Sequence, residues 1–158
     1  MYYHASSVKG ITQLTPQSSN HGIPLVYFST KRENVLVYLS NSIEKYCMET
    51  GFSYDGKCQK WGPYGFGKDG RQRLEEDYPN ALISTYKGVS GYIYSAETIS
   101  DSGFSVPIPD VATSSIPVDI SGVEFIPVAY EAILQAKREG LLRIIRYGEM
   151  NYKMKAWS

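Results

Sequence analysis

The chain is poor in residues that bind metals or form disulfides. Its 158 residues include only two histidines and two cysteines, Cys47 and Cys58, whose spacing fits no structural zinc motif. No apolar run is long enough to cross a bilayer, and we expect no signal peptide before the first strand. Lys plus Arg equals Asp plus Glu, 16 of each, so the overall charge indicates no polyanion partner. We therefore expect a cytoplasmic protein that binds no metal and no membrane and does not have nucleic acid as its main partner.

Several motifs of nucleotide and acyl chemistry are also missing. There is no GxxxxGK phosphate loop, no GxGxxG after a strand and no GxSxG elbow. The glycines between Gly62 and Gly70 lack the strand-to-helix context that such loops require. Cys47 could be a thiol nucleophile if a histidine lay beside it. It falls on the apolar face of a predicted helix, however, where a small buried side chain is the better interpretation.

The stretch from Pro24 to Cys47 carries the clearest structural signals. The apolar run Leu25 to Phe28 predicts a buried strand. A helix should follow at once, with Thr30 as N-cap, Glu33 closing a capping box, and Gly51 as the C-terminal stop. The apolar residues of this stretch recur at the spacing of one helix face: Val35, Leu36, Leu39, Ile43, Tyr46 and Cys47.

Two cations, Lys31 and Arg32, fall in the first turn of that predicted helix. Positive charge at this end opposes the helix macrodipole, and a bound anion would relieve the conflict. The alternative is that both are ordinary solvated surface side chains.

The remaining patterns predict one strand-rich α+β domain over residues 1–158, with bent or split sheets and two main helices. The second helix should span Val128 to Glu139, with Pro127 in its first turn. We expect a loop from Ser102 to Ser115, one helical turn over Leu74 to Tyr78, and a loose tail at 150–158. Further strands and a short helix are predicted at the first few residues, Ser90–Ala96, Pro117–Ile120, Val123–Ile126 and Leu141–Tyr147, and at Ala81–Tyr86.

Residues 52–79 read as an aromatic, glycine-rich insertion or loop. An Asp55-Gly56 pair predicts a hairpin turn, and aromatic residues then alternate with glycine from Trp61 to Gly67. This segment is either a mobile lid or recognition loop over a cleft, or an irregular excursion held by its own aromatic cluster.

Three short motifs in order resemble the ADP-ribosyltransferase superfamily, in particular its His-Tyr-Glu branch, which includes poly-ADP-ribose polymerases and diphtheria-toxin-like enzymes. The motifs are His4-Ala5-Ser6 on a first strand, Val26-Tyr27-Phe28-Ser29 on the next, and a following helix with Tyr38. The resemblance covers the N-terminal third and continues only as element order. It implies a short, bacterial-type member that uses NAD as substrate and no metal.

The resemblance also implies roles for particular residues. His4 would hydrogen-bond ribose hydroxyls, Ser6 would meet the nicotinamide carboxamide, and Tyr27 and Tyr38 would sandwich the nicotinamide ring. Ala5, Ser29 and Arg32 would complete the cofactor site. Ala5 stands where the family has glycine, so a methyl group lies where the carboxamide meets the backbone.

The acid of the set is Glu124 on the strand VEFIP, or alternatively Glu97 after GYIYSA. Its carboxylate would hold the ribose 2′-hydroxyl and offset the positive charge that develops as nicotinamide leaves. Each of these residues taken singly has an ordinary structural explanation, as core packing or as surface.

The leading hypothesis is an NAD-binding domain that transfers ADP-ribose to an unidentified macromolecular acceptor or to water. One alternative keeps the fold but acts on a phosphorylated RNA end, as RNA 2′-phosphotransferases do. The alternative from a different class is a non-catalytic binding module that uses the aromatic loop Trp61 to Phe66.

Overall fold

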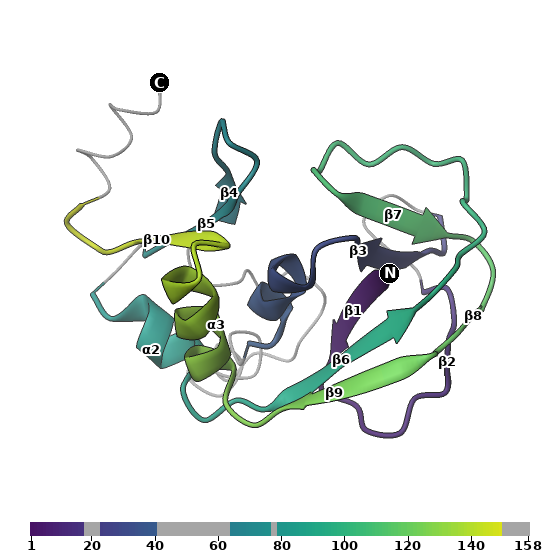
Figure 1. The fold of residues 1–158 in the computed structure, drawn as a ribbon, viewed down its shortest axis with the longest axis horizontal. Helices are drawn as coiled ribbons and strands as arrows, with labels where there is room; N and C mark the ends of the chain where they lie inside the picture. The colour runs from purple at the N-terminus through teal and green to yellow at the C-terminus, as the bar shows by residue number, and fades with distance from the viewer. Residues whose placement is uncertain (18–22, 41–63, 77–78, 150–158) are drawn as a thin grey trace, which may run out of the picture. The chain divides into compact units, whose positions relative to one another are not determined.

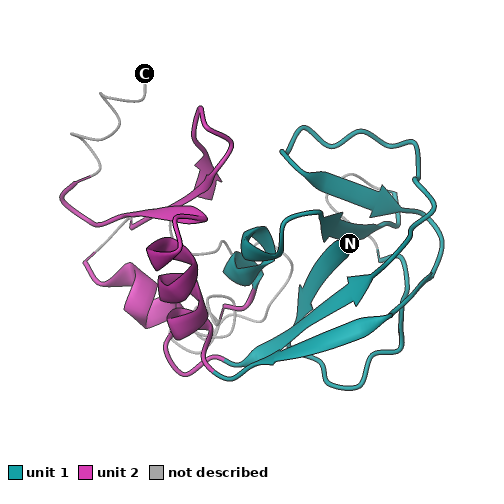
Figure 2. Ribbon diagram, in the orientation of Figure 1, with its two compact units in different colours: residues 1–38, 90–127 teal, residues 39–89, 128–158 magenta. Residues whose placement is uncertain are grey.

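The computed structural model describes residues 1–17, 23–40, 64–76 and 79–149, and these form a strand-rich α+β protein, as the sequence predicts. The chain divides into two compact units (Figure 2). Unit 1 comprises residues 1–38 and 90–127, and unit 2 comprises residues 39–89 and 128–158. Each unit is described separately below.

Unit 1 is built on a five-stranded antiparallel sheet (Figure 1). Its strand order is β7-β3-β1-β6-β9, so β1 is the central strand and lies between β3 and β6. The strands are β1 (Tyr2–Ser6), β3 (Val26–Ser29), β6 (Gly91–Ala96), β7 (Val111–Ser114) and β9 (Gly122–Ile126).

One face of this sheet packs on the core of unit 1. Val26 and Phe28 from β3 and Tyr94 and Ala96 from β6 lie on this face, because successive side chains of a strand point to opposite sides. The short strands β2 (Gln13–Leu14) and β8 (Val118–Asp119) pair with each other and supply the remaining core residues, Leu14 and Val118. We call this the core face.

The other face carries η1 (Arg32–Tyr38), a 3-10 helix that contacts β1, β3 and β6. We call it the η1 face. The predicted helix therefore begins where expected, but its first seven residues form 3-10 rather than α-helix; residues 41–51 lie outside the described part. Thr30 is not the N-cap. Its N–H and hydroxyl both donate to the carbonyl of Asp110, and the hydroxyl of Ser29 accepts the Lys31 N–H instead.

Unit 2 combines a three-stranded sheet with two helices. The sheet order is β10-β5-β4, with β4 (Tyr64–Phe66), β5 (Gln72–Glu75) and β10 (Leu142–Ile145). The helices are α2 (Ala81–Tyr86) and α3 (Ala129–Arg138), which contact each other.

Four local predictions need correction. The loop predicted over 52–79 contains the β4–β5 hairpin, and the helical turn predicted from Leu74 lies partly in β5. The loop predicted from Ser102 contains β7, because Val111–Ser114 pairs with β3. Pro127 precedes the N-cap, Val128, instead of lying in the first turn of α3. The Asp55-Gly56 turn, Trp61 and the tail 150–158 lie outside the described residues.

A buried carboxylate organises unit 2. Glu76 is 2% exposed, and its carboxylate accepts the Leu82 N–H in the first turn of α2 and the Tyr147 N–H just after β10. Its own N–H donates to the carbonyl of Ile145. One glutamate thus ties the end of β5 to the start of α2 and to the end of β10.

An exposed carboxylate braces the turn between β4 and β5. Asp69 accepts 2.7 Å bonds from Arg71 and Arg143, and these bonds lower the pKa of Asp69 from 3.8 to about 2. The folded state therefore holds this carboxylate ionised more strongly than the unfolded state does. Its contribution to stability is full above about pH 4 and is lost as the pH falls through about 2.

We expect the substitution Asp69→Asn to remove this acid-sensitive contribution. The difference in urea midpoint between wild type and Asp69→Asn should shrink as the pH is lowered from about 5 to about 2. A difference that stays constant over that range would contradict the assignment.

Candidate functional site

The sheet of unit 1 opens between β1 and β3. These two strands share one register pair, Tyr3 with Ser29, whereas β1 pairs with β6 along all five of its residues. Leu25, immediately before β3, instead exchanges both of its backbone hydrogen bonds with Gln17. Between these two points, backbone groups of residues 4–6 that face β3 have no ladder partner in β3. We call this opening the split.

The side chain of His4 lies in the split. Its Nδ1 is 2.8 Å from the carbonyl oxygen of Tyr27, a group that a continuous ladder would pair with backbone. A carbonyl oxygen can only accept, so Nδ1 carries the proton and the neutral ring presents Nε2 as an acceptor. The position of β1 therefore fixes both the orientation and the tautomer of His4.

A pocket of about 520 Å³ adjoins the split. Small-molecule sites in proteins commonly have volumes of this order. The pocket lining includes the apolar side chains Ile11, Leu14 and Val26. Its polar lining residues include His4, Ser6 and Gln17. His4 and Ser6 alternate on β1, so both project from the core face toward this pocket.

Burial lowers the pKa of His4 below its ordinary value of 6.5, and the bond to the Tyr27 carbonyl opposes this shift without reversing it. The unfolded chain therefore binds this proton more readily than the folded chain. The stability that neutral His4 contributes is complete above about pH 6.5 and is lost as the pH falls through the lower folded pKa.

We expect the His4 imidazole to titrate below pH 6.5 in an NMR titration. The chain has one other histidine, so the variant His21→Ala assigns the two signals. Protonation would also remove the Nε2 acceptor, so any ligand that depends on it should bind more weakly at acid pH. A His4 signal that titrates at or above 6.5 would contradict this description.

The η1 face carries a second group of predicted residues. Tyr3 and Ser29 are paired, so Ala5 and Tyr27, two residues away on each strand, project on the same side. Ala5 pairs with Ile93, and Ile93 pairs with Glu124. Ala5 and Glu124 therefore lie in one row across the sheet, about 10 Å apart at two strand spacings.

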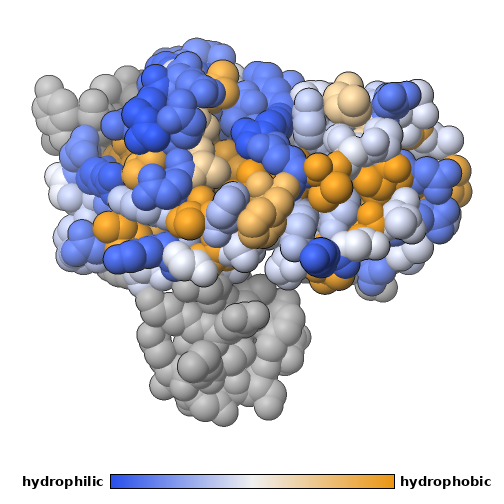
Figure 3. Space-filling model, turned by 60° about the horizontal axis from the view of Figure 1, so that its bottom comes forward, coloured by the Kyte–Doolittle hydropathy of each residue, from blue (hydrophilic) through white to orange (hydrophobic). Residues whose placement is uncertain are grey.

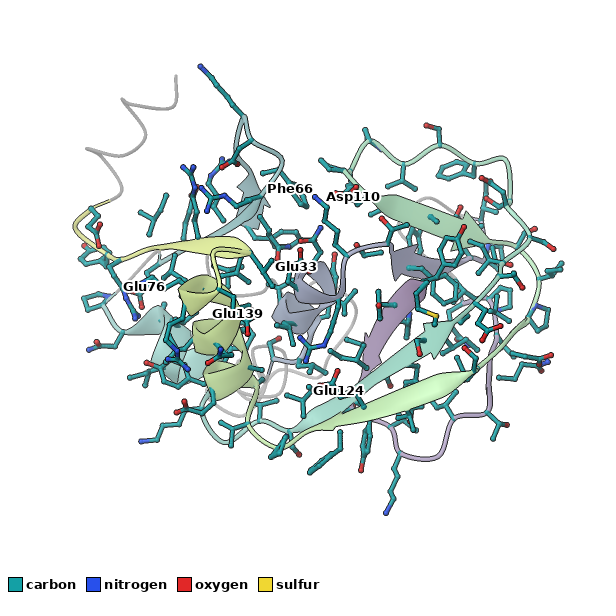
Figure 4. The ribbon with its side chains drawn as sticks, viewed as in Figure 1. Glu33, Phe66, Glu76, Asp110, Glu124 and Glu139 are labelled. Carbon is teal, nitrogen blue, oxygen red and sulfur yellow. The ribbon has the colours of Figure 1, made fainter. Side chains whose placement is uncertain are left out.

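Glu97 does not belong to this row. It follows Ala96, which pairs with Tyr2 at the opposite end of β1 from Ser6. Of the two candidate acids, the sheet register therefore groups only Glu124 with Ala5 and Tyr27. Glu124 is labelled in Figure 4, where it lies on β9, the edge strand.

Lys31, just before η1, and Arg32, its first residue, are both paired with carboxylates of the chain. Arg32 donates two 2.7 Å bonds to Glu124, one to each carboxylate oxygen. Lys31 lies 3.3 Å from Asp110, which precedes β7. The charge conflict that suggested a bound anion is thus relieved within unit 1 itself.

The structure therefore sorts the predicted residues into two groups. His4 and Ser6 project from the core face, and Ala5, Tyr27, Ser29 and Glu124 from the η1 face. Tyr38 ends η1 and is 45% exposed, whereas Ser29 is buried and accepts the Lys31 N–H. At the split, the His4 side chain and the backbone of Ala5 are adjacent, although the side chains of His4 and Ala5 lie on opposite faces of the sheet.

Two residues near this site were not predicted. Asp110 adopts a left-handed backbone conformation, φ 64°, and holds Lys31 and Thr30. Asn34 in η1 is 6% exposed, and its Nδ2 has no hydrogen-bond partner, which leaves a buried donor in the helix that carries Arg32 and Tyr38. The sequence signal for Asn34 was a polar residue within an apolar helical stretch. No sequence pattern pointed to Asp110.

Within the described residues, no three His, Cys, Asp or Glu side chains are grouped so as to hold a metal ion. The same residues include no helix long and apolar enough to span a membrane. Comparison with known proteins finds no match to a family model, to a curated protein or to a solved structure.

Proposed function

We propose that unit 1 binds NAD at the split and transfers its ADP-ribose group to a nucleophile, in the manner of the ADP-ribosyltransferase fold. The observation that carries the proposal is the opening of the β1–β3 ladder beside His4. Where the ladder opens, backbone groups of β1 are not paired with β3, and a planar carboxamide is recognised by backbone donors and acceptors of this kind.

The surrounding residues supply the other contacts that NAD requires. On the core face, neutral His4 offers Nε2 as an acceptor for a hydroxyl of the adenosine ribose, and Ser6 adds a hydroxyl beside it. Tyr27 projects on the η1 face and Tyr38 ends η1, so a nicotinamide ring would stack on these two side chains. The Ala5 methyl narrows the approach to the backbone without blocking the backbone groups themselves.

The reaction breaks the bond between the ribose C1′ and the nicotinamide nitrogen. The bonding electrons leave with nicotinamide, and the positive charge that develops on the ribose is offset by the Glu124 carboxylate. A hydroxyl of the acceptor, or water, then bonds to C1′ and releases its proton to solvent. Glu124 is suited to this role because its side chain is a half-exposed carboxylate and lies in the same row as Ala5.

The charge of unit 1 favours a dinucleotide over a phosphorylated RNA end. Unit 1 has three Lys and Arg against six Asp and Glu, a net charge of −3. Two of its three cations are already paired, Lys31 with Asp110 and Arg32 with Glu124. RNA binding depends on several phosphate contacts from free cations, which this surface does not provide.

A competition experiment tests this assignment. NAD should bind in the micromolar range, about 8 kcal/mol, and both ADP-ribose and nicotinamide should compete with it. If an RNA oligonucleotide with a 2′-phosphate binds and NAD does not, the RNA-end alternative replaces the proposal. If none of them binds, unit 1 is not a nucleotide-binding unit.

A further inference from the structure

The ion pair between Arg32 and Glu124 joins two parts of unit 1 that are 92 residues apart in sequence. Arg32 opens η1, directly after β3, whereas Glu124 lies on β9, three strands away. At about 4.8 Å per strand, β3 and β9 are about 14 Å apart. Because η1 contacts β1 and β6, Arg32 and Glu124 meet on the η1 face, the face that also carries Ala5 and Ile93.

The geometry of the pair constrains the carboxylate. Two parallel bonds of 2.7 Å, from Nε and from Nη2, fix the plane of the carboxylate as well as its position. Without them, a glutamate that is half exposed on an edge strand would sample several rotamers in water. A carboxylate has about four acceptor sites, so two remain for a ligand hydroxyl.

The turn that carries Arg32 is itself fixed. Ser29 is buried, and its hydroxyl accepts the Lys31 N–H. Lys31 turns the other way, to Asp110 beside the opposite edge of the sheet. The start of η1 is thus tied to both edges of the sheet, by Arg32 to β9 and by the preceding residue, Lys31, to Asp110 beside β7.

We propose that Arg32 is the positioning residue for Glu124: its guanidinium holds the carboxylate over the Ala5 row so that it meets the ribose of the bound dinucleotide. This inference rests on the proposed function. It differs from the expectation that Arg32 contacts the cofactor, because a positioning residue affects the rate of the reaction and not the affinity for NAD.

The test compares Arg32→Gln and Arg32→Lys with the matched control Lys31→Gln, which removes the ion pair made by the preceding residue. Nicotinamide release gives kcat, and calorimetry gives the NAD Kd. Arg32→Gln should lower kcat about tenfold or more and change Kd less than about threefold. Arg32→Lys should recover part of kcat, since an ammonium keeps the charge but loses the fork. Lys31→Gln should leave both constants within about twofold.

A double variant separates positioning from a general structural role. In the Glu124→Gln background, Arg32→Gln should lower kcat no further, because the group that it positions is already gone. The proposal is overturned if Arg32→Gln weakens NAD binding about tenfold with kcat unchanged, or if Lys31→Gln lowers kcat as much as Arg32→Gln does. It is also overturned if Arg32→Gln lowers kcat by the same factor in the Glu124→Gln background as in wild type. If wild type binds NAD but releases no nicotinamide, the proposed function itself fails, and the role of Arg32 fails with it.

Discussion

Glu124→Gln should lower the rate of nicotinamide release about 100-fold or more while NAD affinity changes less than about threefold. The amide keeps the size of the side chain but removes the negative charge that, in the proposed reaction, offsets the positive charge developing on the ribose. It also loses one of the two acceptors that Arg32 uses, so the side chain is held less firmly. The measurement is single-turnover nicotinamide release, with affinity determined separately by calorimetry.

Glu97→Gln is the matched control, because Glu97 is the other candidate acid and lies beyond the end of β6, away from the Ala5 row. It should change the rate less than about twofold. A large loss in Glu97→Gln with little change in Glu124→Gln would reverse the assignment of the acid.

Glu76→Ala should destabilise the protein by about 3 kcal/mol. The substitution leaves the Leu82 and Tyr147 N–H groups without the acceptor that they share, and it disconnects α2 from the end of β5. Glu76→Gln should cost nearly as much, since a single amide oxygen replaces two carboxylate oxygens and its NH₂ group would face a backbone donor. Urea unfolding at pH 7 measures the change.

Glu139→Ala is the control for this second prediction. Glu139 is an exposed glutamate at the C-cap of α3 whose carboxylate accepts one bond, from Gln135 (Figure 4). Its loss should change the free energy of unfolding by less than about 0.5 kcal/mol. If Glu76→Ala costs no more than Glu139→Ala, the buried carboxylate does not organise unit 2 as described.

Hydrophobic side chains also reach the surface on the edge strand β9, where Val123 and Phe125 are 61% and 54% exposed. They project on the core face beside Tyr92, whose ring lies 5.3 Å from that of Phe125. Figure 3 shows hydrophobic side chains at the surface on the side of the molecule that it presents. These residues explain why the alternating pattern of β9 is less clear than that of β6: both of its faces are partly open to solvent.

Local patterns predicted the position of several elements. The apolar run ending at Phe28, the alternation of GYIYSA and the helical spacing after Pro127 correspond to β3, β6 and α3. The errors came where partners distant in sequence decide the structure. Leu74 and Glu75 lie in the polar run that predicts a helical turn but are in β5, because β10 pairs with them from about 70 residues away. Val111–Ser114 is a strand because β3 offers it an edge.

The candidate site was predictable in its residue types but not in its arrangement. The order of His4, Tyr27, Tyr38 and Glu124 can be read from the sequence. Which side chains share a face depends on register, and register places His4 on the core face and Glu124 on the η1 face. The pairing of Arg32 with Glu124 could not be foreseen, because it joins segments that meet only after β1 and β6 are in place.

The most direct test of the account is calorimetric titration of NAD into wild type, His4→Ala and Lys31→Gln. We expect wild type to bind, His4→Ala to lose about tenfold or more in affinity, and Lys31→Gln to match wild type. This pattern would locate the dinucleotide at the split, where His4 offers its Nε2 beside the opened ladder. Equal affinities for all three proteins, or no binding by wild type, would contradict the account.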